Sequence, residues 1–230
     1  MNKAIFAIVI AACGDDGGKD ATVDIDNGSC GDQVRLFGEY VDWDDNQTFC
    51  GILGATLVAE GNGAMSMTAP NGRYDLCLPD QALTRVNITQ PSANSQCTSP
   101  ISGYTVPTIL SAARNVIQGG GFYSARAWTT ERQATFFQAA GVQFDSNKAQ
   151  VFVHVNGTPH PLSLAAPHAA TQAVAMTTWA AGDTGKEVFF PNVDVGSGTT
   201  TISVSGASMT AGASIPLVAG TITNIAVIIR

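Results

Sequence analysis

Residues 65–78 read MSMTAPNGRYDLCL, and this stretch decides the fold class. The PNG triplet at 70–72 is a turn signal, because proline presets φ and an Asn-Gly pair tolerates positive φ. The residues before and after it alternate apolar with polar side chains, which is the period of a half-buried strand. We therefore predict a tight turn with a strand on each side.

Strands with turns between them continue outward in both directions from this stretch. Short alternating or apolar runs punctuated by Gly, Asn and Pro are typical of sandwiches and barrels. In the second half, 215–218 and 221–229 could form a closing hairpin across Ala219-Gly220. The other predicted strands lie at 34–41, 52–58, 84–89, 150–155, 184–193 and 200–204.

One segment between the two β-rich halves favours a helix. Residues 130–140 have a threonine at the start and precede Gly141, which could end the helix. Phe136, Phe137 and Ala140 would then face a domain, and the glycine run at 119–121 would be a flexible joint or a turn. The predicted fold class is all-β, with two small antiparallel β-sandwich domains joined by a segment with one short helix. The alternative is a single large sandwich whose core is shared by both halves.

The first half resembles a known family. Residues 37–42 (FGEYVD), 53–58 (LGATLV) and 68–79 (TAPNGRYDLCLP) look like a carboxypeptidase regulatory-like domain, and Gly103-Tyr104 resembles its terminal segment. The resemblance implies a prealbumin-like (transthyretin-like) β-sandwich with an accessory, non-catalytic role. A weaker second copy is suggested by 150–155 and 184–193. The expected domains are a β-sandwich at 32–106, a connector at 107–146 and a second β-sandwich at 147–230.

The N-terminus carries an export signal. A basic start precedes the apolar run 4–12, which is less than half of the roughly 20 residues that a spanning helix needs. Ile10-Ala11-Ala12-Cys13 resembles the lipobox of bacterial lipoproteins. We expect a signal peptide at 1–12, lipid on Cys13 and a flexible acidic tether at 13–31. This predicts a lipid-anchored protein of the bacterial cell envelope, on the outer membrane or cell surface. The alternative is an ordinary secretory signal with Cys13 as a spare thiol.

Cysteine usage agrees with export. Lipid on Cys13 leaves Cys30, Cys50, Cys77 and Cys97, an even number in the first half of the chain. Oxidising compartments favour disulfides, and four cysteines allow three pairings. The preferred pairing is Cys50–Cys77 with Cys30–Cys97. Zinc is the alternative, but the spacings contain no CxxC pair.

The charge pattern excludes one class of partner. Without residues 1–12 the chain keeps 10 of its 11 basic residues, because Lys3 is lost, and all 18 acidic ones, a formal charge of −8. Nucleic-acid binding requires a cationic surface, which this chain lacks. We therefore assign membrane attachment to the lipid alone, and we expect a glycan or an envelope protein as the other partner.

No catalytic or metal-binding motif stands out, and no cofactor is expected. The chain lacks both the Gly-x-Ser-x-Gly nucleophile turn and the His-Glu-x-x-His zinc helix, so we predict a non-catalytic binding or structural module. The alternative is a metal-dependent or hydrolytic enzyme with a loop-built site. The candidate ligand site is the acidic turn, which could bind calcium or a sugar, because its carboxylates could accept hydroxyl hydrogens and its indole could stack on a sugar ring. Its residues are Asp42, Trp43, Asp44 and Asp45.

Overall fold

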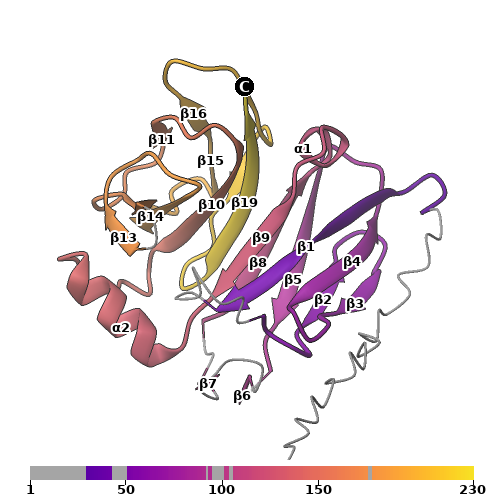
Figure 1. Cartoon of the computed structure of the whole chain (residues 1–230), viewed down its shortest axis with the longest axis horizontal. Helices are drawn as coiled ribbons and strands as arrows, with labels where there is room; N and C mark the ends of the chain where they lie inside the picture. Colours follow the sequence, from indigo (N-terminus) through magenta and orange to yellow (C-terminus); the bar gives the residue numbers. More distant parts are fainter. Residues whose placement is uncertain (1–29, 43–50, 92, 95–100, 104–105, 176–177) are drawn as a thin grey trace, which may run out of the picture.

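The computed structural model describes residues 30–42, 51–91, 93–94, 101–103, 106–175 and 178–230 (Figure 1). The predicted all-β fold is confirmed, because strands packed in layers make up about half of these residues and only two short helices accompany them. We call residues 30–127 the first lobe and residues 149–230 the second lobe.

The first lobe is a sandwich of two layers. A three-stranded sheet has the order β4-β1-β9, and it packs on the β8-β5-β2-β3 end of a ten-stranded sheet. Leu36 and Tyr40 of β1 lie in the core between the layers, together with Leu57 of β2 and Leu110 of β8. The strands are β1 (Val34–Asp42), β2 (Thr56–Ala59), β3 (Met65–Met67), β4 (Arg73–Leu78), β5 (Leu83–Thr89), β8 (Thr108–Ala113) and β9 (Tyr123–Ala127), and a short pair apart from these sheets consists of β6 (Ala93–Asn94) and β7 (Ile101–Ser102).

The predicted turn at 70–72 is present, and it joins the two layers. β3 pairs with β2 in one sheet, whereas β4 pairs with β1 in the other. Gly72 has a φ of +76°, and an added Cβ there would lie 2.2 Å from the carbonyl oxygen of Tyr40. The turn therefore needs glycine both for its backbone angle and for the close approach of β1.

The preferred disulfide pairing was wrong. The structure joins Cys30 to Cys77, with 5.5 Å between their Cα atoms. The antiparallel register explains this, because Val34 at the start of β1 lies opposite Leu78 at the end of β4. Cys30, just before β1, therefore reaches Cys77 and not Cys97, and Cys77 is not left for Cys50. Both Cys50 and Cys97 lie outside the described residues, so their own bonding stays a prediction.

The second lobe packs the other end of the long sheet against two short strand pairs. The sheet order there is β13-β12-β14-β10-β19, and β17 pairs with the end of β19. Val151, Val153 and Val155 of β10 lie in an aliphatic core with Val227 of β19. The strands are β10 (Ala149–Gly157), β11 (Leu162–Leu164), β12 (Gln172–Ala175), β13 (Thr178–Ala181), β14 (Glu187–Val193), β15 (Thr199–Thr200), β16 (Ile202–Val204), β17 (Met209–Thr210), β18 (Ile215–Pro216) and β19 (Ile222–Ile229).

The predicted closing hairpin does not form. β18 pairs with β15, while β19 runs parallel to β10 on one side and to β8 on the other. Every residue of β19 is buried, so the strand belongs in the middle of a sheet rather than at an edge.

The two lobes share this long sheet, as Figure 1 shows where β10 and β19 run beside β8. The expected connector at 107–146 contains β8 and β9 as well as two helices, α1 (Arg114–Gln118) and α2 (Thr130–Ala139). The glycine run at 119–121 is a turn: its three backbone N–H groups donate to carbonyls of α1. The division into a separate second domain at 147–230 stays a prediction. A sheet that both lobes share is also what the alternative, a single large sandwich, would contain.

Among the described residues, no helix is long and apolar enough to cross a membrane. The signal peptide, Cys13 and nearly all of the tether lie outside the described residues, as do Trp43, Asp44 and Asp45 of the acidic turn.

Candidate functional site

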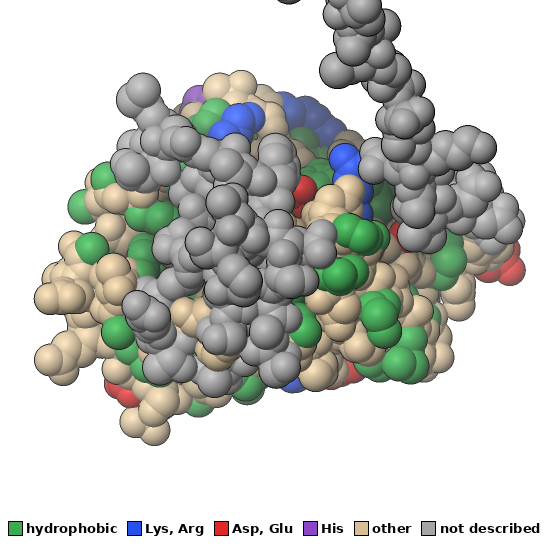
Figure 2. Space-filling view, turned by 60° about the horizontal axis from the view of Figure 1, so that its bottom comes forward, with side chains coloured by type: hydrophobic (Ala, Val, Ile, Leu, Met, Phe, Trp, Pro, Cys, Tyr) green, Lys and Arg blue, Asp and Glu red, His purple; other side chains and the backbone are tan. Residues whose placement is uncertain are grey.

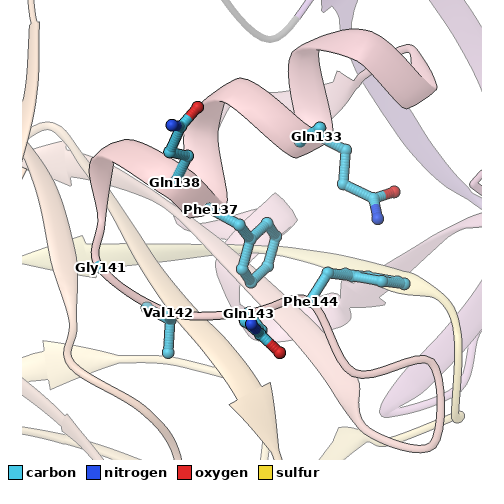
Figure 3. A pocket seen from close by; sticks show the side chains of 8 residues that line it. Gln133, Phe137, Gln138, Gly141, Val142, Gln143 and Phe144 are labelled. Carbon is cyan, nitrogen blue, oxygen red and sulfur yellow. The ribbon is translucent and has the colours of Figure 1, made fainter.

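A pocket with a neutral lining lies beside α2. Its cavity volume is about 530 Å³, and no lining residue carries a charge. The helix and the chain that follows it make up the whole lining, as Figure 3 shows from close by. The lining residues are Gln133, Ala134, Phe137, Gln138, Gly141, Val142, Gln143 and Phe144.

The apolar face of α2 attaches the helix to the second lobe. Phe136 and Phe137 are buried, as the sequence predicted, and Ala140 packs against the same cluster. Both phenylalanine rings contact Trp128 and Phe189 at centroid distances of 5.2–6.3 Å. Burial of each phenylalanine contributes roughly 1.5–3 kcal/mol, and this aromatic contact makes the helix a fixed wall.

Gly141 ends the helix, as predicted, and reverses the chain. Its φ is +68°, its N–H donates to the Gln138 carbonyl, and the N–H of Val142 donates to the Phe137 carbonyl. These two bonds form a Schellman motif. The chain therefore turns back beneath the helix, and the ring of Phe144 meets the ring of Phe137 edge-on at 5.3 Å.

Asn192 at the end of β14 holds the far wall of the pocket. It has a φ of +51°, the one positive value among the described non-glycine residues. Its side-chain amide donates to the Gln143 carbonyl at 2.6 Å, and its side-chain oxygen accepts the N–H of Asp145 at 3.1 Å. Gln150 binds both its N–H and its side-chain oxygen. An unusual backbone angle persists only where the surroundings fix it, and here four hydrogen bonds do so.

The geometry suits a neutral ligand with an apolar face. In Figure 3 the Phe137 ring points from α2 toward the returning chain, Gln133 points to the same side, and Gln138 points away at the rim. The carboxamides can donate and accept hydrogen bonds, and the partly exposed ring of Phe144 can pack on carbon. Figure 2 shows the face brought forward from the bottom of Figure 1, on which neutral and hydrophobic side chains predominate and charged ones are scattered.

Sequence reasoning missed this pocket, although two of its signals were visible. The helix and its glycine stop were predicted, and these dictate that 142–144 turns back. What the sequence could not indicate was Asn192, which lies 49 residues from Gln143. The acidic turn that was predicted instead begins with Asp42, which is 1% exposed and whose carbonyl accepts a hydrogen bond from Arg126. A ligand at Asp42, Trp43, Asp44 and Asp45 stays a prediction.

A second polar cluster lies between β9 and the β10–β14 pair. The buried guanidinium of Arg126 forms an ion pair with Glu187 and donates to the Asp42 carbonyl at 3.0 Å. His154 lies directly opposite Glu187 in the strand register. Burial raises the pKa of Glu187, and Arg126 opposes this in part. Burial, with the charges of Arg126 and Lys186, lowers the pKa of His154 to about 4, so the imidazole is neutral at pH 7.

This cluster contains the residue types of a hydrolytic triad without its hydrogen bonds. The hydroxyl of Ser124 on β9 donates to a carboxylate oxygen of Glu39 at 3.1 Å. Nδ1 of His154 and Oε2 of Glu187 are buried, and neither has a hydrogen-bond partner among the residues that the structure describes. A nucleophilic serine needs its proton accepted by a base, and the bond to Glu39 orients Ser124 into an ion-pair cluster rather than toward an imidazole. Within the described ranges, no three His, Cys, Asp or Glu side chains are grouped to hold a metal.

No family model matches the chain, and no curated protein matches it. Among solved structures, 86% of the chain is similar to 34% of the chain in "The Bacillus anthracis TIE protein", with 9% sequence identity and a TM-score of 0.27. The chain thus spans about a third of that protein's length, and a likeness this distant has no bearing on function.

Proposed function

We propose that the protein is an exported lipoprotein of a bacterial cell envelope, and that its β-sandwich fold presents the α2 pocket to bind a neutral carbohydrate without catalysis. The lipobox-like residues before Cys13 support the anchor. The observation that carries the binding role is the lining of the α2 pocket, where aromatic rings and carboxamides occur together and charges do not.

Carbohydrates match this lining in chemistry and in size. A sugar ring presents a face of C–H groups, which packs on an aromatic ring, and hydroxyls around its edge, which bond to carboxamides. The pocket volume of about 530 Å³ lies within the usual range of roughly 300–1,000 Å³ for small-ligand sites. A charged ligand would find no lining group of opposite sign.

A glycan array probed with the purified soluble domain tests the binding role. We expect neutral glycans to bind, and Phe144→Ala to weaken binding because it removes the partly exposed ring while Phe137 still anchors the helix. Trp43→Ala is the matched control, since it alters the acidic turn and Trp43 is not among the residues that line the α2 pocket. Loss of binding in Trp43→Ala alone would move the site to the acidic turn. Binding to no glycan at all would refute the proposed role.

The anchor has a separate test. Mass spectrometry of the mature protein should find an acylated N-terminal Cys13, and Cys13→Ala should release the chain or block its processing. An unmodified N-terminus elsewhere would remove the anchor and leave the binding role untouched.

A further inference from the structure

A second pocket lies on the outer face of the three-stranded sheet. All of its lining residues precede α2 in the sequence. Its cavity volume is about 420 Å³. Phe37 of β1 is 47% exposed there, so part of its ring is open to a ligand. The ring of Phe122 meets the ring of Phe37 edge-on at 5.8 Å and that of His154 at 6.0 Å. The lining residues are Arg35, Phe37, Gly38, Arg73, Tyr74, Asp75 and Phe122.

The aromatic wall of this pocket is fixed to the second lobe. The N–H of Phe122 donates to the side-chain oxygen of Asn156 on β10 at 3.0 Å. The side-chain amide of Asn156 in turn donates to the carbonyl of Phe122 at 3.1 Å and to that of Val227 at 3.2 Å. The backbone that carries the Phe122 ring therefore has little freedom to close over the pocket, so the pocket is preformed.

The two arginines in the lining differ in their partners. Arg35 forms an ion pair with Asp75, and its Nε lies 2.8 Å from a carboxylate oxygen. Arg73 is exposed, and within the described part of the chain its guanidinium makes no ion pair or hydrogen bond. Glu39 lies opposite Arg73 in the strand register, but its carboxylate accepts the hydroxyl of Ser124.

The lining is positive in a chain that is negative as a whole. Two arginines against one aspartate give the lining a formal charge of +1, whereas the whole chain carries −7. The lining by itself therefore favours an anion, and the carboxylate of Glu39, opposite Arg73 just outside the lining, accepts a hydrogen bond from Ser124. The phenyl rings that line the same pocket favour an apolar body for the rest of the ligand.

We propose that this pocket binds an aromatic or other apolar carboxylate, with the apolar body against Phe37 and Phe122 and the carboxylate on the guanidinium of Arg73. A guanidinium presents two parallel N–H groups to a carboxylate, and such charge-assisted bonds are stronger than neutral ones. This activity goes beyond carbohydrate binding at α2, and neither site depends on the other.

The test titrates two matched probes into the purified full chain at neutral pH and low salt, followed by NMR. 3-Phenylpropionate carries the carboxylate, and 3-phenylpropanamide has the same body without the charge. We expect the carboxylate to bind about tenfold more tightly, since a hydrogen bond to a charged group contributes that much or more. Resonances of Phe37, Phe122 and Arg73 should shift in both titrations.

Three variants identify the residues responsible. Arg73→Gln should lower the affinity for the carboxylate to that for the amide, and Arg73→Lys should fall between. Phe37→Leu should weaken both probes while keeping an apolar side chain for folding. Arg230→Gln, an exposed arginine of the second lobe, should change neither. Equal affinity for the two probes, an unchanged carboxylate affinity in Arg73→Gln, or no saturable binding would overturn the proposal.

Discussion

The two faces of β10 differ in how they hold the molecule together. Val151, Val153 and Val155 face the aliphatic core of the second lobe, and each is 0–1% exposed. The alternate residues Phe152 and His154 face β9 of the first lobe, where the guanidinium of Arg126 lies 6.0 Å above the Phe152 ring. One face of β10 thus packs in an aliphatic core. The other face contributes to a buried polar cluster of Arg126, Glu187 and His154, which we call the seam.

The difference separates two kinds of stability. The free energy that aliphatic burial contributes depends on the buried area and does not change with pH. The contribution of a buried ion pair depends on the presence of both members and on their protonation. The seam joins the three-stranded sheet of the first lobe to the second lobe. A substitution in the seam should therefore weaken the contact between the lobes, by an amount that depends on pH. A substitution in the core should lower the stability of the second lobe by the same amount at every pH.

Breaking the ion pair of the seam should have the largest effect. Arg126→Ala leaves Glu187 buried without its partner, and we expect a loss of about 3–5 kcal/mol in the free energy of unfolding. The measurement is urea denaturation at pH 7. Arg85→Ala removes an exposed ion pair with Glu60 and should cost less than about 1 kcal/mol.

A double variant makes this prediction sharper. Arg126→Met with Glu187→Leu replaces both charges by apolar groups, and it should recover most of the stability lost in Arg126→Ala. If the double variant is as unstable as the single one, the cost comes from lost packing of Arg126 and not from an unpaired carboxylate.

The core face was predictable from sequence, and the seam was not. The alternation at 150–155 and at 34–41 predicted strands, and β10 and β1 cover both stretches. β8 and β9 were missed because both of their faces are buried, so TILSAA and YSARA show no alternation. The parallel partners of β19 were missed for another reason: periodicity identifies a strand but does not name its neighbours.

At the functional sites, too, the features encoded by neighbouring residues were predicted, and those that depend on residues far apart in the sequence were not. Local signals predicted α2 and its end at Gly141, because a helix stop is encoded within a few residues. The Arg126–Glu187 pair spans 61 positions, and in the sequence each member looks like an ordinary surface charge. The disulfide pairing failed for the same reason, since it depends on the register of β1 with β4.

Acid should weaken the seam through His154. Its pKa is about 4 in the folded chain and about 6.5 when unfolded, so the unfolded state takes up a proton first. The contribution is therefore complete above pH 6.5 and is lost as the pH falls from 6.5 to 4, by roughly 2–3 kcal/mol. Glu187 acts in the opposite sense, because its raised pKa favours the folded state as the pH falls.

Comparison with His154→Gln isolates the histidine. The stability difference between the wild type and this variant should change between pH 6.5 and 4 and stay constant above 6.5. NMR titration of the imidazole measures the pKa directly, and a value near 6.5 in the folded chain would contradict this account.

Enlarging a void on the core face should cost less and should not depend on pH. Val153→Ala removes two buried carbons from a fully buried side chain, and we expect a loss of about 2 kcal/mol. Urea denaturation at pH 5 and pH 7 should give the same difference from the wild type. A difference that varies with pH would mean that the two faces of β10 are coupled.

The smallest effect should come from Asn192, at the end of the strand that pairs with β10. Glycine adopts a φ of +51° without strain, so Asn192→Gly relieves the backbone while it removes the side-chain bonds to Gln143, Asp145 and Gln150. Because the two effects oppose each other, we expect a net loss of only about 1 kcal/mol.

The wall of the α2 pocket should loosen in Asn192→Gly, since the Gln143 carbonyl loses its donor. Amide hydrogen exchange should therefore speed up at 143–145, and neutral glycans should bind more weakly, while 3-phenylpropionate binding at Arg73 stays unchanged. Asn62→Gly is the control, because it removes side-chain bonds from a turn in the first lobe and Asn62 lines neither pocket. Wild-type exchange rates at 143–145 in Asn192→Gly would mean that the Schellman turn at Gly141 alone positions the pocket wall.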